Sequence, residues 1–287
     1  MTVLRHNRSV RLPHRILIAC VLAALTLALP VSARQRSSQA DNSVDAIVAR
    51  AADYLRDYRD QLTYVMATER YTQTLTGGFS QYDMDESLAS DVYFVYVPAD
   101  KVWMAIRDVE IVDGKVLKER DNVRALLNSG QVGAARALKD KNARYNLGTI
   151  VRNFNEPTLS LLVLDDDRRS RFTFVRQKLS SGRATVSFAE FGNPTLIANV
   201  NGMPAFSKGE FTIDVATGRV ERAELRVRLG KVDATLTTTY ALEPKLKMWV
   251  PTRFDEYYVE DGKRPQKITG KALYSDYSRF DVQVRIK

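Results

Sequence analysis

Four acidic residues at predicted strand positions have the side chains best suited to hydrolytic chemistry: Glu69, Glu190, Asp214 and Glu256. Glycoside hydrolysis uses two carboxyl groups, one as the acid and the other as the base or nucleophile. Two of these acids could meet only from different strands, because neighbours on one strand, such as Asp255 and Glu256, point to opposite faces. Acids on the polar side of strands are common. A carboxylate-based hydrolase is therefore our second alternative, and we assign no catalytic residue.

The first 33 residues have the pattern of a secretory signal peptide. Four arginines precede an uncharged run of fourteen residues, 16–29, and Val31-Ser32-Ala33 follows with small residues. A membrane-spanning helix needs about 20 apolar residues, so this run is too short for an anchor. The sequence predicts cleavage after Ala33 and a periplasmic or secreted protein, with no transmembrane segment in the mature chain.

Cleavage would remove the single cysteine, Cys20, and both histidines, His6 and His14. The mature chain would then have no histidine for a Ser-His-Asp triad or a zinc site and no cysteine nucleophile. The acidic run Asp165-Asp166-Asp167 is followed at once by two arginines, which favours a solvated loop over a cation site. We expect no metal and no cofactor.

The charge pattern makes nucleic acid an unsuitable partner. The net charge of +9 falls to +5 without the signal peptide, because that segment carries four arginines and no acids. In the rest of the chain basic and acidic residues alternate, and the densest basic group, Lys263, Arg264 and Lys267, surrounds a predicted turn. We therefore expect no nucleic acid partner.

The most concentrated set of side chains able to bind a polar or anionic group surrounds Gly148. The set comprises Arg144, Tyr145, Asn146 and Arg152. Arginine donates paired hydrogen bonds to carboxylate and phosphate oxygens. The alternative is structural, with Gly148 ending a helix and asparagines forming turns after it. These four residues are our candidates for a polar head-group site.

Residues 209–286 show the period of two that is typical of antiparallel strands. Apolar residues alternate with polar ones through 211–215, 223–229 and 232–242, and further strands are predicted at 248–258, 268–274 and 280–286. One face of such a sheet is apolar and must be covered. The apolar residues that would line a ligand cavity, or form plain core, are Phe211, Ile213, Leu225, Val227, Leu236, Tyr240 and Phe254.

The rest of the chain supplies the cover. Asn42 is a candidate N-cap for a helix ending near Leu62, whose apolar residues are three, four or seven positions apart. Strand patterns follow at 64–77, 91–97 and 101–112 and return at 172–179, 184–191 and 196–200. Between them, helical spacing predicts a central helical insertion at 117–167. We predict a flexible tail at 34–42 and a single α+β domain at 43–287.

The passage from helix to strand at 44–75 and the signature Phe211-x-Ile213-Asp214-x-x-Thr217-Gly218-x-Val220 resemble the lipoprotein-localisation carriers, or LolA-like proteins, and related envelope sensors. The resemblance implies a strongly curved antiparallel half-barrel sheet, covered by the N-terminal helix, with an apolar cavity between them. The helical insertion departs from the carrier pattern. Arg107-Asp108-Val109 and Arg144-Tyr145-Asn146-Leu147-Gly148 are similar to a family of uncharacterised secreted bacterial proteins, which implies no function.

Our leading hypothesis is an exported, non-enzymatic carrier or sensor that binds a lipid or other apolar molecule between the curved sheet and its helices. At about 0.8 kcal/mol per buried methylene, a chain of about 14 carbons gains roughly 11 kcal/mol before the costs of association. The first alternative is a structural or interaction protein of the cell envelope, with a filled core and an envelope protein as its partner.

Overall fold

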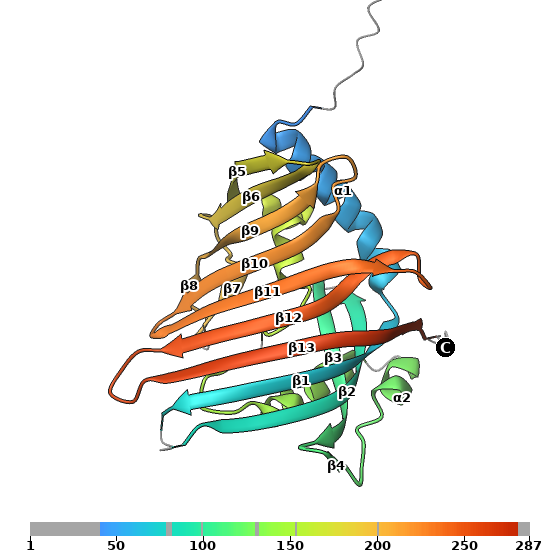
Figure 1. The fold of residues 1–287 in the computed structure, drawn as a ribbon, viewed down its shortest axis with the longest axis vertical. Coiled ribbons are helices and arrows are strands. Elements are labelled where there is room, and N and C mark those ends of the chain that lie inside the picture. The colour runs from blue at the N-terminus through green and yellow to red at the C-terminus, as the bar shows by residue number, and fades with distance from the viewer. Residues whose placement is uncertain are drawn as a thin grey trace, which may run out of the picture. The chain divides into compact units, whose positions relative to one another are not determined.

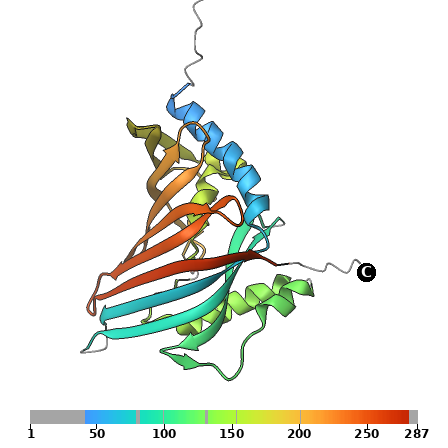
Figure 2. The ribbon, with the colours of Figure 1, turned by 45° about the vertical axis from the view of Figure 1, so that its right-hand side comes forward.

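Eleven antiparallel strands form one sheet in the part of the chain that the structure, a computed structural model, describes: residues 41–280 without 79–81, 99, 130–131, 153 and 200 (Figure 1). The strand order is β4-β3-β2-β1-β13-β12-β11-β10-β9-β6-β5. Their bounds are β1 Val65–Gly77, β2 Met84–Val97, β3 Val102–Val112, β4 Lys115–Val116, β5 Phe172–Ser180, β6 Arg183–Glu190, β9 Ser207–Asp214, β10 Val220–Leu229, β11 Val232–Glu243, β12 Met248–Glu260 and β13 Gln266–Arg279. The sheet curls without joining β4 to β5 (Figure 2). The predicted α+β fold with a curved antiparallel sheet is confirmed.

Strand β13 differs from the two strands predicted for this part of the chain. It continues from Gln266 to Arg279, and its buried positions change phase between Tyr274 and Tyr277. Asp276 has φ 52° there, and the pairing of β13 with β1 shifts register at the same place. This bulge breaks the alternation, so the sequence pattern stops early although the strand does not. From residue 281 onward, the strand predicted at 280–286 lies outside the described residues.

The N-terminal helix α1 (Val44–Leu62) lies across one face of the sheet, which we call the covered face (Figure 2). Its buried residues are those of the predicted apolar stripe, except the half-buried Val44, together with Ala52. The N-cap is Ser43 rather than Asn42, because the Ser43 hydroxyl accepts from the amide of Ala46 at 3.3 Å. The signal peptide and nearly all of the predicted tail fall outside the described residues.

Gly218 lets the turn between β9 and β10 approach α1. A Cβ at this residue would overlap the backbone carbonyl of Arg50 in the helix, and its φ of +73° is a conformation that favours glycine. We expect Gly218→Ala to lower the free energy of unfolding by about 2–4 kcal/mol, combining the cost of the positive φ with that of overpacking. Urea denaturation would measure the loss.

Gly230 provides the matched control for this substitution. Its φ is +64°, and a Cβ there would meet nothing within 4 Å. Gly230→Ala should therefore cost only the backbone term, about 1 kcal/mol. Equal losses for the two variants would contradict a close contact between α1 and the turn.

The predicted helical insertion at 117–167 is only partly helical. It contains α2 (Val123–Asn128), α3 (Val132–Lys141), two 3₁₀ helices, η1 (Asn142–Tyr145) and η2 (Leu159–Leu164), and α4 (Asp166–Arg169). Residues 146–158 form an irregular segment between them, which we call the connecting segment. None of the helices within the described residues has the length and apolar character that crossing a membrane requires.

Two apolar cores explain how these pieces are placed. The larger core lies between the covered face, α1 and η2. In a smaller core, α2 and α3 pack against the side chains of β2 and β3 that point away from the covered face. Its members include Tyr93, Ile106, Val123 and Leu138. Residues 92–97 of β2 and 102–106 of β3 are therefore largely buried on both faces, which accounts for the nearly continuous apolar sequence there.

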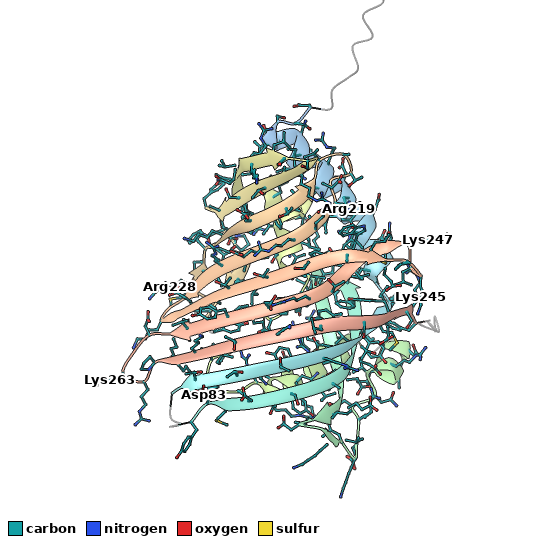
Figure 3. All side chains as sticks on the ribbon, in the orientation of Figure 1. Asp83, Arg219, Arg228, Lys245, Lys247 and Lys263 are labelled. Atoms are coloured by element: carbon teal, nitrogen blue, oxygen red, sulfur yellow. The ribbon has the colours of Figure 1, made fainter. Side chains whose placement is uncertain are left out.

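Charged residues on the uncovered face of the sheet pair locally. Arg253 donates to Asp255 two positions along β12, with Nε 2.6 Å from Oδ2, and Arg222 donates to Glu224 in the same way at 2.6 Å. Residues two apart on a strand share a face, so the sequence itself sets up these pairs. Figure 3 shows Asp83, Arg228 and Lys263 at one end of the strands and Arg219, Lys245 and Lys247 at the opposite end.

Candidate functional site

Polar side chains occupy buried positions on the covered face near the middle of the sheet. In β1, Glu69, Tyr71 and Gln73 have the same buried parity as Val65 and Leu75. Glu256 of β12 likewise lies between buried Phe254 and Tyr258, whereas Asp255 points the other way. Buried polar groups need partners, so these positions require an explanation.

Glu69 is held by Arg107 of β3. The guanidinium donates through both Nε and Nη2, the second to Oε1 at 2.9 Å, and the Glu69 side chain has no exposed surface. Burial alone would lower the pKa of Arg107, but the adjacent Glu69 carboxylate raises it above its ordinary value. The Arg107 guanidinium also lies 5.4 Å from the ring centre of Tyr71. The two-point contact fixes both side chains.

Arg152 reaches into the same region from the connecting segment and is only 1% exposed. Its Nη2 donates to Gln73 Oε1 at 2.7 Å and to the carbonyl of Leu147 at 3.2 Å, while Nη1 donates to the Tyr71 hydroxyl at 3.2 Å. Its Nε is buried and has no hydrogen-bond partner among the described residues. Arg152 therefore ties the connecting segment to β1 while leaving one donor unused.

Glu256 is the carboxylate nearest to Arg152, but it does not form a close ion pair with it. Glu256 Oε2 is 3.9 Å from Arg152 Nη1 and accepts from the Tyr258 hydroxyl at 2.9 Å. The other oxygen, Oε1, is buried without a partner in the described part of the chain. Burial raises the pKa of the Glu256 carboxyl, and Arg152 and Arg107 offset this only in part. Glu256 therefore holds a proton more strongly than an exposed glutamate.

Gly270 of β13 makes room for this network. A Cβ at Gly270 would lie 2.6 Å from the Tyr71 hydroxyl and 3.1 Å from its ring. The absence of a side chain lets Tyr71 lie over β13, where its hydroxyl meets Arg152.

A cavity of about 200 Å³ opens beside the two arginines. Its polar lining comprises Arg107, Lys139, Asp140, Asn142, Asn146, Arg152 and Asn155. Lys139 in turn pairs with buried Glu156. The cavity is therefore polar, and three of its four charged lining residues are cations.

Two further cavities are linked to this polar cavity by shared lining residues. The second, of about 440 Å³, shares Lys139 and Asp140 with it, and the rest of its lining combines charged residues, Asp100, Arg136, Glu156 and Arg168, with apolar ones such as Trp103, Leu159 and Leu162. The third, of about 190 Å³, shares Phe154 with the second. Apart from Asn199, its lining residues are apolar: Ile150, Val151, Phe154, Ala198, Leu229 and Val232. The row thus runs from a cationic end to an apolar end.

The seven apolar residues predicted to line a ligand all lie on the covered face, in the larger core. Phe211, Ile213, Leu225, Val227, Leu236, Tyr240 and Phe254 are each at most 4% exposed. The three cavities described above are lined by other residues. These seven side chains point to the face of the sheet that the alternation predicted. Their contact with a ligand stays a prediction.

The four predicted head-group residues separate into two pairs. Asn146 and Arg152 both line the polar cavity. Arg144 instead lies 43% exposed near Asp121, with its guanidinium 4.7 Å from the ring centre of Tyr145. Tyr145 contributes its backbone carbonyl, which accepts from Gln73.

Two of the four acids considered for hydrolysis have structural partners instead. Glu190 accepts from the backbone amides of Leu196 at 2.6 Å and Ser207 at 3.0 Å, which fixes the start of β9. Asp214 accepts from the amide and hydroxyl of Thr217 in the turn before β10. Only Glu69 and Glu256 reach the polar network on the covered face.

The acidic run at 165–167 also has structural roles. Asp165 caps α4, since its carboxylate accepts from the amide of Asp167 at 3.2 Å. Asp166 accepts from Arg56 of α1 at 2.9 Å, and Asp167 accepts from Lys101. These contacts attach α4 to the neighbouring elements.

The site residues predicted from the sequence did not include Arg107, Gln73 or Lys139. Gln73 could have been identified from the sequence, because it occupies one of the alternate positions of its strand that are otherwise apolar. Glu69 and Tyr71 occupy such positions as well. Arg107 and Lys139 carry no comparable signal, since this part of β3 is largely buried on both faces and Lys139 lies at the end of a helix. Only the fold brings these two residues to the cavity.

No protein-family model matches this sequence, and neither does any curated protein. Three solved structures are similar in fold. A Vibrio parahaemolyticus domain described as an outer membrane lipoprotein-sorting protein has 12% identity over 83% of this chain and 93% of its own, with a TM-score of 0.37. A LolA superfamily protein from Nitrosomonas europaea has 12% identity over 83% and 94%, with a TM-score of 0.32. A DUF1329 family protein from Desulfovibrio piger has 11% identity over 84% and 94%, with a TM-score of 0.33.

Two of these three proteins carry the lipoprotein-sorting or LolA name that the sequence resemblance led us to expect. Because every TM-score lies below 0.5, we take nothing from them about what this chain binds.

Proposed function

We propose that this protein is an exported, non-enzymatic carrier or sensor that holds a lipid or other amphipathic molecule between the covered face of the sheet and the connecting segment. One observation carries the proposal: each cavity shares lining residues with the next, and the row has a cationic cavity at one end, one lined by both charged and apolar residues in the middle, and one lined mostly by apolar residues at the other end. A molecule with a polar end and an apolar chain has this same gradient. The apolar end would contact Ile150, Val151 and Phe154, and the polar end would lie near Arg152 and Asn146.

The energetics allow a carrier of this kind. Each methylene moved from water into an apolar cavity contributes about 0.8 kcal/mol, so a few methylenes offset part of the cost of association. A ligand longer than the third cavity would extend along the covered face. There it would meet the predicted lining residues, such as Leu236 and Tyr240, if the connecting segment moved aside.

A direct test is mass spectrometry of an organic extract of the protein, purified from a bacterial periplasm without detergent. We expect a lipid in stoichiometric amount. An empty extract from well-folded protein would overturn the loaded-carrier proposal. It would favour the alternative of an envelope interaction protein with a filled core.

Val151 offers a binding test that spares the fold. It lines the apolar cavity and is 56% exposed, so Val151→Asp should fold normally while placing a carboxylate in that cavity. We expect the affinity for the neutral fluorophore N-phenylnaphthylamine to fall about tenfold or more, measured by fluorescence titration.

Val175→Asp is the matched control. Val175 on β5 is 54% exposed and does not line the three cavities described above. It should bind the fluorophore as the unaltered protein does. An equal loss in both variants would show that the fluorophore does not occupy the apolar cavity.

A further inference from the structure

We propose that the polar cavity binds the anionic head of the carried molecule, a single carboxylate or phosphate group, and that Arg152 is the residue that recognises it. This inference rests on the proposed function and assigns the ligand class. The charge of the lining, the partners of each cation and the unused donor of Arg152 support it.

The cations of the cavity differ in how fully they are neutralised. Arg107 donates twice to Glu69, and Lys139 is paired with Glu156. Arg152 has no carboxylate within hydrogen-bond distance, since the nearest oxygen, on Glu256, is 3.9 Å away. Arg152 is thus the cation whose charge the described residues compensate least.

Arg152 also retains hydrogen-bonding capacity. Its Nη1 and Nη2 donate to neutral acceptors on Gln73, Tyr71 and Leu147, and its Nε has no partner among the described side chains and backbone. A buried donor without a partner is costly, because it has lost its hydration. An oxyanion beside Arg152 would accept from this donor and supply the missing negative charge.

The acids around Arg152 do not cancel this preference. Glu69 is committed to Arg107, and Glu156 to Lys139. Asp140 is the one acid among the residues that line the polar cavity. Glu256 accepts from the Tyr258 hydroxyl and lies 3.9 Å from Arg152, and burial raises the pKa of its carboxyl. An anion near Arg152 would favour protonated Glu256 further, because two negative charges would otherwise lie close together.

The lining also excludes other head groups. A quaternary ammonium head would lie near Arg152, whose charge has no carboxylate within hydrogen-bond distance, and this repulsion would disfavour it. A hydroxyl head could accept one hydrogen bond but would leave the charge of Arg152 uncompensated. Carboxylate and phosphate share the required chemistry, and the experiment can separate them.

The test is competition against N-phenylnaphthylamine at pH 7.5 by four molecules with the same twelve-carbon chain: dodecanoate, dodecyl phosphate, dodecanol and dodecyltrimethylammonium. The fluorophore is neutral, so its binding reports the apolar cavity and not the head-group site. We expect dodecanoate, dodecyl phosphate or both to displace it at concentrations about tenfold or more below dodecanol, as charge-assisted hydrogen bonds allow. The ammonium compound should compete less well than dodecanol.

The variants use the same assay. Arg152→Gln combined with Glu256→Gln removes both buried charges, which keeps the site neutral. In this double variant the acids should compete no better than dodecanol, within about twofold. Arg253→Gln removes an exposed arginine of the uncovered face and should keep the full preference.

Each outcome is decisive. Equal competition by acids and alcohol, preference for the ammonium compound, or a preference that survives in the double variant would overturn the head-group inference and leave the carrier proposal standing. If the fluorophore does not bind and none of the four molecules binds directly in calorimetry, the carrier proposal itself fails.

Discussion

Arg152→Gln should lower the free energy of unfolding by about 3–5 kcal/mol at pH 7, the range typical of removing one partner from a buried charged pair. The substitution leaves Glu256 buried without the nearest positive charge and removes the donor groups that hold Gln73, Tyr71 and the carbonyl of Leu147. Urea denaturation followed by circular dichroism would measure the loss.

The loss should depend on pH in a definite direction. The pKa of Glu256 is raised in the folded state above the value of about 4.3 expected in the unfolded chain. For such a group the folded state binds the proton more tightly, so stability is greatest below the unfolded pKa and declines as pH rises through the folded pKa. Without Arg152 the folded pKa rises further. The loss caused by Arg152→Gln should therefore be smaller at pH 5 than at pH 8.

Two comparisons make this expectation specific. Arg253→Gln removes an exposed arginine and should cost less than about 1 kcal/mol. The double variant Arg152→Gln, Glu256→Gln should be more stable at pH 8 than Arg152→Gln alone, because Glu256 no longer leaves a buried carboxylate without its nearest cation. A loss of equal size at both pH values would show that Glu256 is not the group that Arg152 stabilises.

The pair of Arg107 and Glu69 carries the second large effect. Arg107→Met should also cost about 3–5 kcal/mol at pH 7, because the Glu69 side chain would be left with no exposed surface and without its two-point partner. Adding Glu69→Gln should recover most of the loss, since a neutral amide is cheaper to bury than an unpaired carboxylate.

A double-mutant cycle in urea denaturation gives the coupling between the two side chains. We expect the losses of Arg107→Met and Glu69→Gln to be strongly non-additive, by about 3 kcal/mol or more, because the double variant recovers most of the loss. Additive losses would mean that each side chain is stabilised by other neighbours. The partly exposed pair of Arg222 and Glu224 on the uncovered face should show a coupling below about 1 kcal/mol.

The strands were predictable from sequence where one face is buried and the other is solvated. There the alternation of apolar and polar residues fixes both the strand and the direction of each side chain, as in β10 and β11. The pattern weakens where that condition fails. The bulge at Asp276 hides the continuation of β13, and burial on both faces removes the alternation from parts of β2 and β3.

The connecting segment shows a different limit. Helical spacing at 117–167 correctly indicated α2 and α3, but residues 146–158 are held by long-range contacts. Thr238 and Tyr240 both donate to the carbonyl of Pro157, and Gln73 accepts from the amide of Leu147. Such contacts depend on the register of distant strands, which local periodicity does not contain.

The candidate site was predictable only for residues whose type and position in the sequence already suggested a polar or catalytic role. Arg152 and Asn146 belong to a concentrated polar group in the sequence, and Glu69 and Glu256 are acids on strands. The sequence did not indicate which of the polar residues contact one another in the folded protein. Glu69 with Arg107, and Arg152 with Gln73, become neighbours only through the order of strands β3, β2 and β1 and the path of the connecting segment.

The pairing of β1 with β13 has a consequence for the order of events in folding. Strand β1 follows the first helix, while β13 is the last described strand, and the two pair from Val65 opposite Arg279 to Gly77 opposite Gln266, with one register shift at the bulge. The four strands from β4 to β1 therefore join the remaining seven only when β13 has been synthesised and pairs with β1. Contacts so distant in sequence slow folding, because the closure entropy of the whole intervening chain precedes their gain. Until that joint forms, β1 has a free edge, and the network of Glu69, Tyr71 and Gln73 lacks its neighbouring strand. A polypeptide built in this way completes its sheet late.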